Sequence, residues 1–461
     1  MLQPIVFSAT SYFPRISARL TLCVIASVLS TLCSGCGTFR LNQYAGPGFV
    51  IYSDRNAQFV ATIGKKVDLI SDAYTELFQV SRHDMGFMTI VLEGEESNVV
   101  DYGYSPDVLG YYVPVVHYLS VDTNPIWPEG EGLLEQILFH EVAHHYIVSL
   151  YPKASDTCWL NEGLAGVLEV SLHRDRHFEY PLFHPVLFSV SQQIAYSNQE
   201  FPDLEKLVGM TWTQFHGAQT KEKHYALSWS IVYFILEHHF SRDVPLAQRV
   251  EWLCKMTDDE IVALEQPWLR FLRGFDSTNH LLELGASTAP DQRLSSTWAL
   301  NKLGTIRTLD DLRILKGLSR FFSHDSPQRR FAAYSSFVER LERASYSFVL
   351  DEDWVQEGLR DIRNALRNPA NSNRLRDDLI DTLSRSLVYD ADWVPTLIQL
   401  LRWPDGLTRA KAAACLARIA SKPTVINPSF WRSGRVELRV EEAEDWDRWW
   451  THQSYRSATI P

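Results

Sequence analysis

The segment FHEVAHHYIV, residues 139–148, places two histidines and a glutamate in a helical pattern. Residues 131–150 carry an apolar stripe and are followed by Pro152, so we expect a single helix over this range. Within it, His140 and His144 are four residues apart, a spacing that puts both imidazoles on one helix face. Two such rings can reach one zinc ion at about 2.0–2.1 Å. The pattern favours a metal-binding helix, with an ordinary polar face that matches by chance as the alternative.

Glu141 lies one step round the same helix, beside the two histidines. A carboxylate in that position can hydrogen-bond a zinc-bound water without itself binding the ion. It would then serve as the general base of a hydrolytic reaction. The predicted roles are therefore metal binding for His140 and His144 and proton transfer for Glu141.

Two histidines alone do not hold a catalytic zinc ion firmly, so a third ligand is required. WLNEGLAGVLE, residues 159–169, opens a second predicted helix over about 160–174 after a short loop. If the two helices pack antiparallel, the carboxylate of Glu162 comes to the metal. Cys158 is an alternative ligand, although a buried core thiol is the favoured interpretation. We expect Glu169, two turns beyond Glu162, to have no part in metal affinity.

These two segments together resemble the gluzincins, zinc metallopeptidases in which His-Glu-x-x-His is followed by a glutamate in a Trp-Leu-Asn-Glu-Gly context. The resemblance implies that zinc is bound by His140, His144 and Glu162, with Glu141 as the base. Residues 145–161 separate the two motifs, a gap one residue shorter than in the aminopeptidase-type members. A one-residue deletion in the connecting loop accounts for the difference without moving the helices.

In order and content, residues 46–285 resemble the peptidase MA-like family of gluzincins. Within HYALSWSIVYFIL, residues 224–236, Tyr225 matches the gluzincin tyrosine that donates to the oxyanion of the transition state. The alternative for Tyr225 is a residue that merely begins a helix. No Gly-x-Met-Glu-Asn run, which binds the free amine in aminopeptidase-type gluzincins, precedes the motif helix. The resemblance therefore implies an endopeptidase rather than an aminopeptidase.

The chain upstream of the motif helix has the pattern of a small mixed sheet with one helix. FVIYS, FMTIVL, GYYVPVV and HYLSV are predicted strands, and Pro114 marks the third of these as an edge. Apolar residues at helical spacing predict a helix over 56–80. Together with the two motif helices, these elements predict an α+β zincin-like domain over 46–285.

Beyond residue 290 the pattern becomes helical only. Three stretches, which begin near positions 312, 359 and 394, each show an apolar helix, a turn with proline and an arginine-led second helix. The last resembles a HEAT-like repeat closely and the others loosely, so we expect an all-α HEAT-like domain over 295–425, with a generic helical domain as the alternative. Residues 426–461 are an acidic and aromatic tail that either packs back as a cap or serves as a contact.

The amino terminus has the organisation of an export signal. Arg15 and Arg19 precede an apolar run of 13 residues, which is shorter than the roughly 20 residues of a membrane span. The Ser-Gly-Cys that ends at Cys36 resembles the end of a bacterial lipobox. We therefore expect a lipoprotein-type signal peptide over 1–35, a lipidated Cys36, and a membrane-anchored location in the cell envelope facing the periplasm or exterior. An uncleaved anchor and a start codon assigned too far upstream are the alternatives.

The net charge of −12, with no cluster of basic residues, argues against nucleic acid as a partner. The sequence predicts an exported zinc-dependent peptidase in which Glu141 activates a zinc-bound water for attack on a peptide bond. Its expected partners are a peptide or protein substrate, the membrane through the N-terminal lipid, and a protein bound to the C-terminal helical domain. The rival hypotheses are an envelope interaction or scaffold lipoprotein with a degenerate zincin domain, and a zinc hydrolase that acts on a non-peptide bond.

Overall fold

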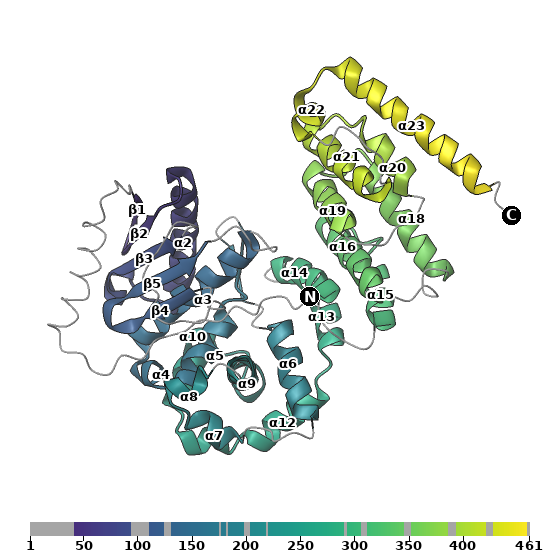
Figure 1. The fold of residues 1–461 in the computed structure, drawn as a ribbon. Helices are drawn as coiled ribbons and strands as arrows, with labels where there is room; N and C mark the ends of the chain where they lie inside the picture. The colour runs from purple at the N-terminus through teal and green to yellow at the C-terminus, as the bar shows by residue number, and fades with distance from the viewer. Residues whose placement is uncertain are drawn as a thin grey trace. The chain divides into compact units, whose positions relative to one another are not determined.

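The computed structural model describes residues 41–93, 110–123, 131–174, 177–180, 183–197, 203–217, 220–289, 293–305, 311–344, 352–385, 393–420 and 427–458. The chain divides into two compact units, with the boundary between Phe275 and Asp276. Among the described residues, the first unit is a mixed sheet with helices and the second is helical only, as the sequence predicts (Figure 1). The predicted signal peptide, 1–35, and Cys36 lie outside the described residues. None of the described helices has both the length and the apolar character needed to cross a lipid bilayer.

The first unit is built on a five-stranded sheet in the order β1-β2-β3-β5-β4 (Figure 1). The strands are β1 (Asn42–Gly46), β2 (Phe49–Ser53), β3 (Met88–Glu93), β4 (Gly110–Val113) and β5 (Tyr118–Asp122). The three central strands run parallel, whereas the edge strands β1 and β4 are antiparallel to their neighbours. Pro114 follows β4 directly, and since proline has no N–H to donate, the strand ends there, at the edge of the sheet as predicted.

Two helices, α2 (Ala57–Phe78) and α3 (Glu131–Leu150), pack against each other and against the sheet. α2 contacts β1 and β2, and α3 contacts β4 and β5. The Asn56 side chain accepts a hydrogen bond from the Phe59 N–H at the start of α2, and Gln79 ends the helix in the left-handed conformation. Both helices match their predicted ranges. Fully buried apolar side chains fill the layer between helices and sheet: Ile51, Val67, Ile70, Ile90, Leu119, Ile137, Leu138 and Val142.

Three further helices of the first unit pack one after another, beginning at α3. They are α5 (Cys158–Leu168), which contacts α3, then α9 (Lys221–Phe234), which contacts α5, and α6 (Pro185–Tyr196), which contacts α9. The predicted extension of the second motif helix to residue 174 is wrong. The hydroxyl and the N–H of Ser171 both donate to the Leu168 carbonyl and end the helix. Residues Leu172–Arg174 instead form β6, which pairs with β7 (His177–Glu179).

Short elements complete the first unit. They are η1 (Arg82–Met85), η2 (Pro114–Val116), α4 (Pro152–Asp156), α7 (Leu204–Val208), α8 (Trp212–Phe215), the π-helical turn η3 (Ile235–His239), α10 (Leu246–Lys255), α11 (Asp258–Val262) and α12 (Glu265–Gly274). Of these, α8 matters most for the site, because the residue that follows it faces the metal ligands described below.

In the second unit, α13 (Ser277–Ala286) and α14 (Arg293–Thr305) precede three helix pairs that coincide with the three predicted stretches. The pairs are α15 (Asp311–Ser319) with α16 (Pro327–Ala344), α18 (Asp353–Arg367) with α19 (Asn373–Arg385), and α20 (Trp393–Leu400) with α21 (Gly406–Ala420). The second helices stack in order, α16 on α19 and α19 on α21. The tail forms α22 (Pro428–Ser433) and α23 (Val436–Ala458), and α23 packs back on α20 with Trp446 buried.

Candidate metal centre

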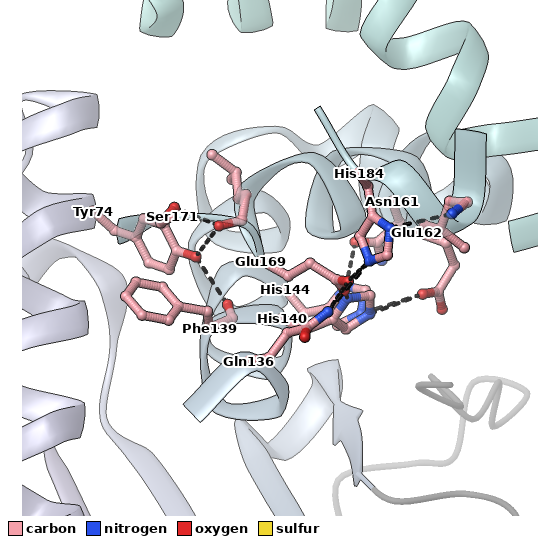
Figure 2. A network of polar contacts seen from close by, with 12 residues as sticks. Tyr74, Gln136, Phe139, His140, His144, Asn161, Glu162, Glu169, Ser171 and His184 are labelled. Carbon is pink, nitrogen blue, oxygen red and sulfur yellow. Dashed lines mark hydrogen bonds and ion pairs between the residues drawn. The ribbon is translucent and has the colours of Figure 1, made fainter. Parts of the chain in front are cut away.

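His140 and His144 on α3 and Glu162 on α5 meet in the interior of the first unit (Figure 2). Nε2 of His140 and Nε2 of His144 each lie 3.4 Å from the same atom, Oε2 of Glu162. All three residues are at most 1% exposed. The structure therefore brings together the three residues that the sequence predicts as metal ligands, and we call them the metal-binding group.

The spacing inside this group suits a metal ion. Four ligand atoms placed tetrahedrally at about 2.0–2.1 Å from zinc are about 3.3–3.4 Å from one another. A good N–H···O hydrogen bond is shorter, about 2.9–3.0 Å. Among the described residues the buried Nε2 of His144 has no hydrogen-bond partner, a cost that a bound cation would remove. Two imidazole nitrogens and a carboxylate oxygen are also a donor set that zinc accepts, so the residues present fit the ion.

The second nitrogen of each histidine ring is held by an acceptor (Figure 2). Nδ1 of His140 lies 2.5 Å from Oε2 of Glu169, and Nδ1 of His144 lies 2.8 Å from Oδ1 of Asn161. Each Nδ1–H therefore donates to its partner, and each Nε2 is directed at Glu162. Partners of this kind fix the orientation of metal-binding histidines and raise their basicity.

Glu169, for which the sequence predicts no part in metal affinity, lies in contact with the ligand His140. Its carboxylate also accepts a hydrogen bond from Nε2 of Gln136, 2.8 Å away, and lies 2.9 Å from Nε2 of His184 (Figure 2). Glu162 lies on α5, and Glu169, seven residues later, follows its last residue with helical backbone angles, so both side chains lie on the same side of the helix. Because α5 packs along α3, the two carboxylates reach opposite nitrogens of the single His140 ring. That spacing is visible in the sequence, but its meaning depends on the packing of α5 along α3.

The charges of the site shift one another's pKa values against the effect of burial. Burial lowers the pKa of His140, but the hydrogen bonds with Glu162 and Glu169 outweigh it and raise the pKa to about 10. Burial raises the pKa of Glu169, yet the hydrogen bonds with His140 and His184 bring it down to about 2. In the metal-free protein His140 therefore carries a proton on Nε2, which a metal ion must displace when it binds.

Glu141 is buried beside the metal-binding group, under the edge strand β4. It is 0% exposed, and a Cβ placed on Gly110 would lie 3.0 Å from its Oε1. Glycine thus allows β4 to pass this close to α3. The charge of Glu141 contributes to the raised pKa values of both His140 and Tyr225. The predicted base therefore lies close to a predicted ligand and to the predicted donor.

A close approach of α5 and α9 brings Tyr225 to the same place. Gly163 follows Glu162 directly, and a Cβ there would lie 2.6 Å from the Ser228 carbonyl oxygen, so only a residue without a side chain permits this helix contact. Tyr225, one turn before Ser228 on α9, is buried. Burial and the charges of Glu162 and Glu141 raise the pKa of Tyr225 well above 10, and the phenol therefore keeps its proton.

The sequence did not predict His216, the residue that follows α8. Its Nε2 lies 3.8 Å from Oε1 of Glu162, and its Nδ1 lies 3.4 Å from the Tyr225 hydroxyl. No motif marks the stretch WTQFHG, and only the packing of α8 against α5 brings its histidine here.

Two other residues near the motifs face elsewhere. Nδ1 of His145 lies 3.0 Å from the Tyr112 hydroxyl on β4, away from the metal-binding group. The Cys158 thiol donates to the Met210 carbonyl at 3.2 Å, and burial raises its pKa to about 12. Cys158 is therefore a core thiol in this structure, as the sequence favours.

Comparisons with protein-family models, with curated proteins and with solved structures give no match to this chain. The likeness to the gluzincins rests on the two quoted motifs and on two features of the fold. The first feature is a mixed five-stranded sheet with helices. The second is a buried group of His140, His144 and Glu162 that could hold a metal ion.

Proposed function

We propose that this protein is a zinc-dependent hydrolase that cleaves peptide bonds, more in the manner of an endopeptidase than of an aminopeptidase. The observation that carries the proposal is the arrangement of the metal-binding group. Two Nε2 atoms lie 3.4 Å from one carboxylate oxygen in a buried site, with the separate carboxylate of Glu141 beside them. Structural zinc sites are closed by four protein ligands, whereas catalytic sites use three and leave a position open.

Each residue has a defined task in this proposal. Zinc held by His140, His144 and Glu162 would supply Lewis acidity, which polarises a substrate carbonyl and acidifies water. Glu141 would take the proton from the attacking water and return it to the leaving amine. The pair formed by His216 and Tyr225, on the Oε1 side of Glu162, would donate a hydrogen bond to the substrate oxygen.

The peptide bond as substrate, export and lipid anchoring at Cys36 are supported by the sequence alone. The resemblance to gluzincins favours a peptide over other hydrolysable bonds, and the Ser-Gly-Cys after an apolar run favours a lipoprotein. Several acyl chains would hold the protein firmly at a membrane. The stacked helices of the second unit would then offer a surface to a protein partner.

A single substitution, Glu141→Gln, tests the function. It keeps the size and hydrogen bonding of the side chain but removes the base, so zinc content and circular dichroism should match the wild type. Cleavage of a broad peptide library should fall by at least about 10²–10⁴-fold, the usual contribution of a positioned general base. Glu135→Gln is the matched control, because Glu135 lies on the same helix in a partly exposed ion pair with Lys66, and it should cleave normally.

Three outcomes of this experiment separate the hypotheses. Cleavage by wild type and loss in Glu141→Gln support the peptidase. If both proteins hold zinc and neither cleaves any peptide, a scaffold or a hydrolase of another bond takes its place, and ester and amide substrates decide between these two. If Glu141→Gln cleaves as fast as wild type, the assigned base is wrong.

A further inference from the structure

The carboxylate of Glu169 connects the ring of His140 to the start of α6 (Figure 2). One of its oxygens, Oε2, lies 2.5 Å from Nδ1 of His140. The other, Oε1, is held from two sides, by Nε2 of Gln136 at 2.8 Å and by Nε2 of His184 at 2.9 Å. Glu169 is 4% and His184 7% exposed, so water has little access to these contacts. Two donors on Oε1 keep the opposite oxygen directed at His140.

His184 is at the same time the N-cap of α6. Its Nδ1 accepts a hydrogen bond from the Leu187 N–H at 3.2 Å, three residues further on, as a capping side chain does. A ring nitrogen that accepts from a backbone N–H carries no hydrogen, so the hydrogen of this ring is on Nε2. Capping of the helix therefore makes His184 a donor to Glu169.

Contacts elsewhere in the first unit hold α6 in place. Ser191 is 0% exposed, and its hydroxyl lies 2.7 Å from the Ala226 carbonyl oxygen on α9. Nε2 of Gln192 donates to the Leu272 carbonyl, near the end of α12, at 2.9 Å. These contacts fix α6 without the participation of the metal-binding group. The helix is therefore a rigid support for the ring of His184.

We propose that His184 is a positioning residue of the metal site, which transmits the fixed orientation of α6 through Glu169 to the ring of His140. The inference deepens the proposed function and rests on its zinc site, but not on the kind of bond that is cleaved. Zinc binding and the capping of α6 are then linked, because the same hydrogen bonds serve both. Zinc should therefore slow the opening of the first turn of α6, although α6 contributes no residue to the metal-binding group.

Two substitutions separate the two hydrogen bonds of His184. The amide of asparagine lies near the position of Nδ1, so His184→Asn keeps the cap of α6 and loses the donor to Glu169. The amide of glutamine reaches the position of Nε2, so His184→Gln keeps the donor and weakens the cap. His184→Ala loses both.

Zinc affinity should follow the donor. It is measured on the full chain by competition with a chromophoric chelator. His184→Asn and His184→Ala should each weaken zinc binding by about 3- to 10-fold, less than the 10- to 100-fold of a partner that touches a ligand directly. His184→Gln should bind zinc nearly as tightly as wild type. Asn56→Ala is the control, because it removes the corresponding cap of α2, where Asn56 accepts from the Phe59 N–H, and should leave zinc affinity unchanged.

Hydrogen exchange at the Leu187 amide should follow the cap instead. In the zinc-free protein it should be nearly unchanged in His184→Asn and faster in His184→Gln and His184→Ala. Zinc should slow this exchange in wild type by about 3- to 10-fold, since the coupling is the same in both directions. In His184→Asn, which lacks the link to Glu169, zinc should not slow it.

The cobalt-loaded protein gives a signature that a merely structural role would not change. Beside the paramagnetic ion, the Nδ1–H protons of His140 and His144 give separate, strongly shifted NMR signals, and Glu169→Gln identifies that of His140. In His184→Asn the His140 proton should exchange faster with water, because its acceptor is less firmly held. The His144 proton, which donates to Asn161, should exchange as in wild type.

The results separate this proposal from the function it rests on. Wild-type zinc affinity in both His184→Asn and His184→Ala would overturn the proposal and leave the proposed function intact. A loss of affinity in His184→Gln as large as in His184→Asn would reduce His184 to a structural role and likewise overturn it. If the wild type binds no zinc, the proposal and the proposed function both fall. Zinc affinities that follow the donor in a protein that cleaves no peptide would support the proposal and contradict the function.

Discussion

The two units bury charged side chains in contrasting ways. In the first unit the buried imidazoles and carboxylates face one another, and His140 and His144 both direct Nε2 at Glu162. In the second unit two of the buried arginines, Arg376 and Arg409, donate mainly to backbone carbonyls. The guanidinium of Arg376 donates to the Leu366 carbonyl at the end of α18 and to the Asn368 and Asn371 carbonyls in the turn that leads to α19.

Arg409 repeats this arrangement in the next helix pair. It lies near the start of α21 and donates to the Trp403, Pro404 and Trp431 carbonyls. In both arginines all three guanidinium nitrogens donate, so these charges are satisfied within the fold. In the metal-binding group a buried nitrogen of His144 remains without a hydrogen bond among the described residues. A buried charged group whose hydrogen bonds are all made within the fold indicates a structural role. Several buried polar groups that face one point and leave a hydrogen bond unmade indicate a binding site.

The largest expected effect follows removal of a ligand. Glu162→Ala should weaken zinc binding by more than about 100-fold, because even residues that only support ligands contribute 10- to 100-fold. Competition with a chromophoric chelator measures the affinity. Stoichiometric zinc in this variant at submicromolar free metal would show that the group is not the metal site.

In the second unit the expected effect is on folding alone. Arg376→Met leaves at least three carbonyls, at the end of α18 and in the turn that follows, without their donor, which should lower the stability of this unit by about 3 kcal/mol. Hydrogen exchange in the full chain would locate the loss to α18 and α19. Zinc affinity should be that of the wild type. If Arg376→Met lowered zinc affinity as well as stability, the purely structural role assigned to Arg376 would be wrong.

Glu169 tests how far the metal site extends. Glu169→Gln removes the charged acceptor of the His140 Nδ1–H, and zinc affinity should fall by about 10- to 100-fold. Glu179→Gln, another buried glutamate in the same unit, is the control and should keep its zinc. Equal zinc affinities in Glu169→Gln and wild type would support the expectation from the sequence that Glu169 has no part in metal affinity.

The smallest expected effect is on peptide cleavage, after a substitution next to the proposed base Glu141. In Gly110→Ala the new Cβ would lie 2.9 Å from Cγ2 of Ile137 and 3.0 Å from Oε1 of Glu141, so β4 or the carboxylate must shift. Peptide cleavage should fall by about 10-fold, because displacement of a catalytic group by a fraction of an ångström misaligns the reaction. Zinc content should not change. Full activity would mean that Glu141 works from a position other than the one under β4.

Much of the fold was predictable because its elements carry local signals. The alternation of apolar residues, Pro114 at a strand end and the stripe of α3 depend only on neighbouring residues, and the structure agrees with each of them. The end of α5 was not predicted, because a continued apolar pattern concealed the Ser171 hydrogen bonds that terminate the helix.

Some residues of the site were likewise predictable from local sequence, and others were not. His140, Glu141 and His144 lie within one helical turn, and the context of Glu162 resembles a known motif, so local sequence reveals them. Glu169 was visible as a seven-residue spacing but had no meaning until α5 was known to run along α3. His216 comes to the site through the packing of α8 on α5, and nothing local indicates it.

The most direct test of the metal centre is titration of chelator-treated protein with zinc, followed by X-ray absorption at the zinc edge. We expect one zinc per chain, with two imidazole nitrogens and a carboxylate oxygen at about 2.0–2.1 Å and no sulfur. Because the pKa of His140 is about 10 in the metal-free protein, binding at pH 8 should release about one proton per zinc, measured in weak buffer. Failure to bind zinc saturably, or a sulfur ligand at about 2.3 Å that would point to Cys158, would contradict the His140, His144 and Glu162 site.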